Sequence, residues 1–194
     1  PFLAIYSTFF QRAYDMAVHD IGIQNLPVRL CMDRAGLSGD DGPTHHGLFD
    51  IGYMNHVPNW IFMAAKDEDE FTDMLWTMAN HNAGPSAIRY PRGEGVGAKI
   101  KSKPQILEIG KAEVVEDGTD IALIGLGNLF GMAEKTKSIL EEKGFSVALI
   151  NPRWIKPLDK KCIQDYARKC KVVCTFEDHT LKNGFGASII EMLH

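Results

Sequence analysis

The residues best suited to chemistry lie in one polar stretch, residues 33 to 50, which reads Asp-Arg-Ala-Gly-Leu-Ser-Gly-Asp-Asp-Gly-Pro-Thr-His-His-Gly-Leu-Phe-Asp. It follows an apolar run, residues 27 to 32, that predicts a buried strand. Carboxylates, an arginine and adjacent histidines are poorly suited to a core and well suited to a small anionic ligand. In parallel α/β sheets, ligands bind beyond the carboxyl ends of the strands. The plain alternative is a polar surface loop.

Two more polar segments follow predicted strands, residues 6 to 12 and residues 89 to 92. A parallel sheet would bring all three segments to one rim. The side chains expected to meet there are Tyr6, Arg12, Arg34, Asp41, His45, His46, Arg89 and Arg92. Arginine binds phosphate or carboxylate through paired hydrogen bonds, and histidine moves protons near neutral pH. The sequence therefore predicts an anion-binding rim with a proton-transfer group.

Two other patterns favour simpler interpretations. His45, His46, Asp50 and His56 resemble metal ligands, but adjacent histidines do not readily point at one ion, so no metal ligands are assigned. Residues 125 to 131 hint at a dinucleotide fingerprint. Their spacing is G-x-G-x3-G, and Asn151 stands where an NAD site would have Asp or Glu. A tight strand-to-helix turn is favoured over a nucleotide-binding or interaction module.

The composition is that of an ordinary globular protein, with 194 residues, 45% hydrophobic residues and a net charge of −4. No basic stripe points to nucleic acid, and no apolar run is long enough to span a membrane. The four cysteines, Cys31, Cys162, Cys170 and Cys174, match no common zinc spacing. Reduced structural thiols in the cytoplasm are expected.

Strands and helices are expected to alternate along the chain. Strands are predicted at residues 2–6, 28–32, 60–65, 86–90, 106–116, 120–124, 146–150 and 172–176. Helices are predicted after an N-cap at Ser7 or Thr8, near Leu48, after Asp67, after an N-cap at Asn128, after Asp159 and over 186–193. The helix after Asn128 is expected to bury the stripe Met132, Ala133, Thr136, Ile139 and Leu140. This order predicts an α/β fold with two parallel or mostly parallel sheets and helices on both faces.

A shift to Gly, Lys and Pro over residues 93–104 predicts a linker. The expected organisation is a first domain over 1–95, a linker over 96–106 and a second domain over 107–194. The chain begins with Pro1 rather than methionine and stops within a helical pattern at His194. It is therefore expected to be a piece of a larger polypeptide.

Three motifs in order resemble the 1-deoxy-D-xylulose-5-phosphate synthases, a transketolase-like family that depends on thiamine diphosphate. They are Tyr6-Ser-Thr-Phe-Phe-Gln-Arg-Ala-Tyr-Asp15, the stretch 33–50, and Gly84-Pro-Ser-Ala-Ile-Arg-Tyr-Pro-Arg-Gly93. The resemblance covers most of a pyrimidine-binding domain, expected to be N-terminally truncated, and most of a transketolase C-terminal domain. Transketolases share the string Asp41 to His45, whereas Tyr6 to Phe9 and Arg89 to Arg92 favour the synthase.

The resemblance implies condensation of pyruvate with glyceraldehyde 3-phosphate, with release of carbon dioxide, on a route to isoprenoids and thiamine. It implies that Phe9 stacks on the aminopyrimidine ring and that Arg12 also lies at the cofactor. Arg34 and Arg92 match the pair that grips the substrate phosphate. The residues expected to be catalytic are Tyr6, Asp41 and His45, with His45 as proton donor or acceptor.

The family's Gly-Asp-Gly…Asn motif for Mg²⁺ and diphosphate, and its ylide-forming glutamate, are absent from these residues. The piece alone is therefore expected to be inactive and to bind thiamine diphosphate weakly. The resemblance implies a homodimer with the rest of the parent chain. A transketolase and a 2-oxo acid dehydrogenase β subunit are the alternatives within the class.

Overall fold

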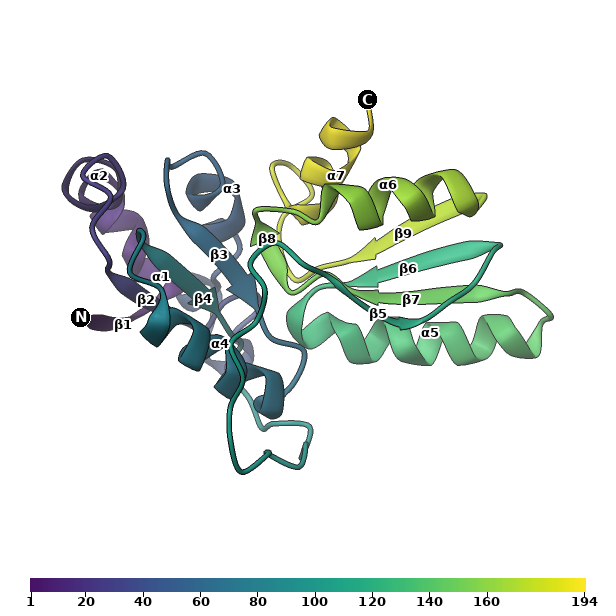
Figure 1. Cartoon of the computed structure of the whole chain (residues 1–194). Coiled ribbons are helices and arrows are strands. Elements are labelled where there is room, and N and C mark those ends of the chain that lie inside the picture. Colours follow the sequence, from purple (N-terminus) through teal and green to yellow (C-terminus); the bar gives the residue numbers. More distant parts are fainter.

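The computed structural model describes residues 1–194 as two α/β lobes side by side (Figure 1). The first sheet has the order β1 (Phe2–Tyr6), β2 (Arg29–Asp33), β4 (Ser86–Arg89), β3 (Ile61–Ala64) and β8 (Trp154–Lys156). The second has the order β5 (Glu113–Glu116), β7 (Val147–Asn151), β6 (Ile121–Gly125) and β9 (Val172–Phe176). Only β8 and β5 pair antiparallel to their neighbours. The predicted fold class is confirmed.

Both faces of the first sheet are covered because its strands are apolar on both sides. Leu30, Met32, Phe62 and Ala87 pack with Phe10, Ile51 and Met54 from the segments after β1 and β2. The alternate strand residues Ile61, Met63 and Ile88 pack with Met74 and Met78 of α4 (Glu68–Asn80). Continuous apolar strands of this kind are typical of parallel sheets between helices.

The segment after β1 is helical but broken. It runs through α1 (Ser7–Phe10), a 3-10 turn (Gln11–Ala13), α2 (Tyr14–Met16) and a π-helical turn (Ala17–Gly22). The cap of α1 is Tyr6, without a side-chain hydrogen bond, so the prediction that Ser7 or Thr8 caps this helix is wrong. Strand β1 runs directly into the helix, which places Ser7 inside the first turn. The short α3 (Asp50–Met54) follows the polar stretch.

Helix α4 begins as predicted, because Asp67 accepts a hydrogen bond from the Glu70 amide at 2.8 Å. The predicted linker that follows β4 is not free. Its backbone N–H groups donate to side chains of α4: Gly97 to Glu68, Lys101 to Asp69, Gln105 to Asp73 and Leu107 to Thr77. Residues 97–107 are therefore fixed along α4, and the strand expected over 106–116 is reduced to β5.

The second sheet alternates in the same way. Ala122, Ile124 and Ile150 face α6 (Lys160–Lys169) and α7 (Phe185–Leu193), while Leu123 and Leu149 face α5 (Phe130–Glu142). Helix α5 is preceded by a 3-10 turn (Gly127–Leu129), so the prediction that Asn128 caps it is wrong.

The buried face of α5 also differs in part from the predicted one. Phe130, Ala133 and Lys137 face inward, whereas Met132 and Ile139, predicted to be buried, are exposed.

Strand β8 was not predicted, and it joins the two lobes. Residues 154–156 follow β7 of the second sheet yet pair with β3 of the first, with Met63 opposite Trp154. The largest core cluster likewise includes Phe62 and Ala64 of the first sheet with Ile124 and Ile150 of the second. The lobes are therefore held by a shared core and not by the covalent connection alone. None of the helices combines the length and hydrophobicity needed to cross a bilayer.

Candidate functional site

The carboxyl ends of β1 and β2 bring the first predicted residues together. These strands pair in register, with Tyr6 opposite Asp33. Arg34 follows Asp33 with a φ of 56°, a left-handed conformation that is uncommon for a residue with a side chain. Its guanidinium lies over the Tyr6 ring, 3.9 Å from the ring centre, and donates to Asp33 at 2.6 Å. The left-handed backbone and these side-chain contacts together place the Arg34 guanidinium at the rim.

Asp41 links the two arginines predicted to bind phosphate. Arg34 Nε donates to Asp41 Oδ2 at 2.7 Å, and Arg92 Nε lies 3.4 Å from the same oxygen. The hydrogen bond from Arg34, assisted by the charge of Arg92, lowers the pKa of Asp41 below its ordinary value. The same bond raises the pKa of Arg34. Asp41 is thus a carboxylate at neutral pH, and the two cations share it.

The aromatic side chains adjoin this charged group. The rings of Tyr6 and Phe9 stack with centres 5.5 Å apart. His45 lies edge-on to both, 5.3 Å from Phe9 and 6.3 Å from Tyr6, and Arg12 lies 5.9 Å from the Phe9 centre. His45 Nδ1 is 3.0 Å from Thr44 Oγ1, which orients the imidazole.

We call these seven side chains the rim cluster. Its members are Tyr6, Phe9, Arg12, Arg34, Asp41, His45 and Arg92. They come from three segments far apart in the sequence and form one connected set of contacts. Of the two arginines paired with Asp41, Arg92 is the more exposed, with a side chain 42% exposed. The arrangement can bind an anion at the arginines beside an aromatic surface and an imidazole.

Two residues expected at the rim lie elsewhere. The side chain of Arg89 is 2% exposed and donates to the buried Asp50 at 2.8 Å, so its prediction as an open rim residue is wrong. The reason is its position in β4, where it points toward α3 rather than past the strand end. His46 accepts a hydrogen bond from the Ser38 amide at 3.0 Å and so holds the loop.

The residues considered as metal ligands find separate partners. His45 lies in the rim cluster, Asp50 pairs with Arg89, and His56 Nε2 lies 2.5 Å from the Tyr14 hydroxyl. No group of three His, Cys, Asp or Glu side chains is arranged to hold a metal ion.

Two supporting residues, Asp33 and Ser38, were missed from the sequence. Asp33 accepts from both the amide and the guanidinium of Arg34. Ser38 is buried, donates to the His45 carbonyl at 2.8 Å, and its own carbonyl faces Arg92 Nη1 at 3.4 Å. Their place in the polar stretch was a signal, but only the folded loop shows which groups they support.

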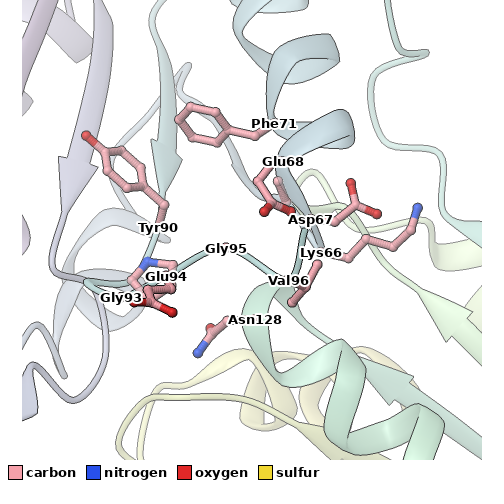
Figure 2. A pocket seen from close by; sticks show the side chains of 12 residues that line it. Lys66, Asp67, Glu68, Phe71, Tyr90, Gly93, Glu94, Gly95, Val96 and Asn128 are labelled. Atoms are coloured by element: carbon pink, nitrogen blue, oxygen red, sulfur yellow. The ribbon is translucent and has the colours of Figure 1, made fainter. Parts of the chain in front are cut away.

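A cavity of about 370 Å³ lies beyond the ends of β3 and β4, between the lobes. Figure 2 shows Phe71 and Tyr90 on one side of it and Asn128, from the second lobe, on the other. The rings of Phe71 and Tyr90 meet edge to face at 5.1 Å. Burial raises the pKa of Tyr90 to about 12, so its hydroxyl stays protonated. The cavity lies at the same sheet edge as the rim cluster, but no residue of the rim cluster lines it.

The glycine-rich turn after β6 is buried against protein. Gly125, Leu126 and Gly127 are buried. A Cβ on Gly125 would lie 2.7 Å from Phe130 Cα, and one on Gly127 would lie 3.1 Å from Ala64 Cβ of the first lobe. The turn packs against protein and leaves no space for a dinucleotide, in agreement with the tight-turn interpretation.

The four cysteines are free thiols. Burial raises the pKa of Cys162 to about 11 and also raises that of Cys31 and Cys170. Groups that remain protonated are poor nucleophiles, so these thiols are suited to packing.

Comparison with known proteins gives two family matches. Residues 1–96 match the transketolase pyrimidine-binding domain, and residues 110–194 match the transketolase C-terminal domain. The 1-deoxy-D-xylulose-5-phosphate synthase of Acidobacterium capsulatum is 54% identical over 194 residues, which are all of this chain and 31% of that protein. The same-named protein of Methylacidiphilum infernorum is 53% identical over 193 residues and is covered to 30%. The chain thus spans about a third of the length of these relatives.

Two solved structures share the fold. A split-gene transketolase, described as an inactive β4 tetramer, has a TM-score of 0.87 at 24% identity, over all of this chain and 62% of that one. Transketolase from Campylobacter jejuni has a TM-score of 0.70 at 17% identity and is covered to 33%. Taken with the sequence matches, the chain belongs to the transketolase-like family, within which its curated relatives are 1-deoxy-D-xylulose-5-phosphate synthases.

Proposed function

We propose that the protein containing this chain condenses pyruvate with glyceraldehyde 3-phosphate, releasing CO₂, to give 1-deoxy-D-xylulose 5-phosphate. The observation that carries the proposal is the meeting of Arg34 and Arg92 at Asp41, beside Tyr6, Phe9 and His45. The names and identities of the curated relatives support the same reaction.

Arg34 and Arg92 are proposed to bind the phosphate of glyceraldehyde 3-phosphate. Both guanidinium groups already lie against one carboxylate, Asp41, so a phosphate dianion entering there meets two cations at once. Asp41 limits the positive charge of the site when no substrate is bound and separates the two cations. This accounts for a carboxylate at the centre of an anion site.

Tyr6, Phe9 and His45 are proposed to serve the reacting end of the substrates. Thiamine diphosphate would supply a carbanion and an electron sink, which no protein side chain provides. The Phe9 ring, 5.9 Å from the Arg12 guanidinium, is proposed to pack against the aminopyrimidine ring. His45 is proposed to hold or deliver a proton at the substrate oxygen, with Tyr6 packing against it.

The side chains here fit the pyrimidine end of this cofactor but include no metal-binding group for its diphosphate end. Magnesium and the ligands for it are therefore proposed to come from other residues of the parent protein. We also propose a homodimer. A cytoplasmic location is proposed because all four cysteines are free thiols.

The test uses the full-length parent protein with pyruvate, thiamine diphosphate, Mg²⁺ and glyceraldehyde 3-phosphate. The expected result is equimolar CO₂ and 1-deoxy-D-xylulose 5-phosphate. Ketose donors in place of pyruvate test for a transketolase, and lipoamide with coenzyme A tests for a 2-oxo acid dehydrogenase. Turnover only with those substrates would overturn the proposal.

A separate titration addresses the isolated 194-residue chain. Because it has no grouped metal ligands, calorimetry with thiamine diphosphate and Mg²⁺ is expected to show no micromolar binding. Micromolar affinity would mean that residues of this chain alone hold the diphosphate.

A further inference from the structure

The segment after β9, residues 178–180 of the second lobe, contacts the base of the loop that carries Asp41 and His45. This loop closes on itself where Gly36 and Gly47 exchange two backbone hydrogen bonds, both 2.8 Å long. Asp41 and His45 lie between these two glycines. Whatever fixes the base therefore fixes the position of both side chains.

Three hydrogen bonds cross between the lobes at this base. Asp178 Oδ2 accepts from the Leu37 amide at 3.1 Å, on the entering side of the loop. The Thr180 amide donates to the Leu48 carbonyl at 3.3 Å, on the leaving side. His179 Nε2 accepts from the Gly52 amide at 3.3 Å, in the first turn of α3. The second lobe thus binds the loop at both of its ends and binds the helix that follows it.

The fit around Asp178 is close. Gly36 has a φ of 81°, and a Cβ placed on it would lie 2.0 Å from Asp178 Oδ2. A side chain at position 36 would therefore displace the carboxylate. Arg89 donates to the Asp178 carbonyl at 3.0 Å and to Asp50 at 2.8 Å, which fixes the Asp178 backbone from the first lobe.

The side chain of His179 is also fixed in position. Its side chain is 1% exposed, beside Asp50 with 0% exposed. Because the Gly52 amide donates to Nε2, the neutral ring carries its proton on Nδ1, which faces the Thr180 carbonyl at 2.9 Å. Both ring nitrogens are therefore used, and neither is available to a substrate.

We infer that Asp178 is a positioning residue for the proposed reaction: through the Leu37 amide, the C-terminal lobe holds the Gly36–Gly47 loop so that Asp41 and His45 face the substrates. This inference rests on the proposed function for its catalytic consequence. The loop contacts themselves do not depend on it. The C-terminal lobe thereby contributes to catalysis without touching substrate.

The test compares Asp178→Ala with two other variants in the full-length protein. Asp178→Asn retains an acceptor oxygen of the same size. Ser188→Ala removes a different hydrogen bond between the lobes, from Asn55 Nδ2 at 2.9 Å, which does not touch the loop. Hydrogen exchange of the amides in residues 36–47 is measured by mass spectrometry, together with kcat, KM and Tm.

Asp178→Ala is expected to speed exchange in residues 36–47 and to lower kcat/KM about tenfold, because small misplacements of catalytic groups are costly. Asp178→Asn is expected to restore kcat/KM to within about twofold, since the acceptor remains. Ser188→Ala should lower Tm without either effect. Equal exchange and kinetics for Asp178→Ala and Ser188→Ala would overturn the inference. A wild-type protein with no synthase turnover would overturn the proposed function instead, while the exchange comparison would still decide whether the loop is held.

Discussion

The carboxyl ends of the two parallel sheets carry out different tasks. In the first lobe, β1, β2 and β4 lead into long charged or aromatic side chains such as Arg34 and Arg92, which remain partly open. In the second lobe, β6 leads into Gly127, which packs on Ala64, and β7 leads into Arg153, which pairs with Glu70 of α4. The first edge is the one proposed to bind substrates, whereas the second edge packs against the first lobe, which lies beside it in Figure 1.

The difference shows that a strand-end loop in an α/β sheet is not by itself a ligand site. Ligands favour this edge in general. Here the second edge is buried by a neighbouring lobe, and its glycines allow close approach of protein rather than of phosphate. The following predictions test this contrast, beginning with the largest expected effect.

Breaking the contact between the lobes at Glu70 should cost the most stability. Glu70 is 4% exposed and accepts from Arg153 Nε at 2.7 Å and from Asn151 Nδ2 at 2.8 Å. Glu70→Ala leaves buried polar groups unpaired, so the free energy of unfolding should fall by about 3 kcal/mol. Chemical denaturation measures this. Lys161→Ala, which removes an exposed ion pair with Asp165, should cost much less stability. Equal losses would mean that the second edge is not a structural contact.

Removing Arg92 should affect substrate binding and not folding. Its contacts to Asp41 and to the Ser38 carbonyl are both 3.4 Å long, so little structure depends on it. In the full-length protein, Arg92→Ala should raise the KM for glyceraldehyde 3-phosphate about 10- to 100-fold, the worth of a charged hydrogen bond. The KM for pyruvate and the Tm should change little. Arg168→Ala, on the exposed face of α6, is the control. A rise in both KM values would contradict phosphate binding by Arg92.

The glycine turn offers a finer test. Gly127 has a φ of 56° and lies against Ala64, so Gly127→Ala should destabilise the protein by about 1–2 kcal/mol. Gly131, four residues on in α5, has open space around its Cβ position. Gly131→Ala should stabilise by about 0.5–1 kcal/mol, because alanine favours helix. Thermal unfolding separates the two. A destabilising Gly131→Ala with a neutral Gly127→Ala would reverse the assigned roles.

The smallest expected effect is the acid dependence of Asp41. Its pKa is lowered in the folded protein, chiefly by the hydrogen bond from Arg34. The stabilisation is therefore fully present above the unfolded pKa of about 3.9 and is lost as the pH falls through the lower folded value. Asp41→Asn should lower Tm at pH 7, and the difference from wild type should disappear in strong acid. Asp40→Asn, at an exposed neighbour, should leave Tm unchanged at every pH. A difference that persists in acid would exclude the ion pair as its cause.

Much of the fold was predictable because it depends on local pattern. Apolar strands such as residues 120–124 and the capping pair Asp67 and Glu70 carry their own signals. Six of the seven residues of the rim cluster were predictable because a parallel sheet collects its strand ends at one edge, whereas Phe9 was predicted only by the family resemblance. Strand β8 could not be predicted, since its three residues pair with β3 of a distant segment and have no periodicity of their own.

The errors have physical causes of the same kind. Arg89 was expected to be open because it ends a strand, but its partner Asp50 is distant in sequence and draws it inward. Met132 and Ile139 were expected to be buried because they are apolar and recur at helical spacing, but α5 packs through the face that carries Phe130, Ala133 and Lys137. The support of the loop by Asp178 depends on a contact between lobes that no spacing in the sequence encodes.

Strand β8 has a consequence for how the protein is made. Until residues 154–156 leave the ribosome, β3 has an unpaired edge, and exposed edges invite association with other chains. Closing that edge requires contacts between residues far apart in sequence, which slows folding. If the gene were cut between the two lobes, the N-terminal product would therefore keep β3 as an exposed, aggregation-prone edge strand.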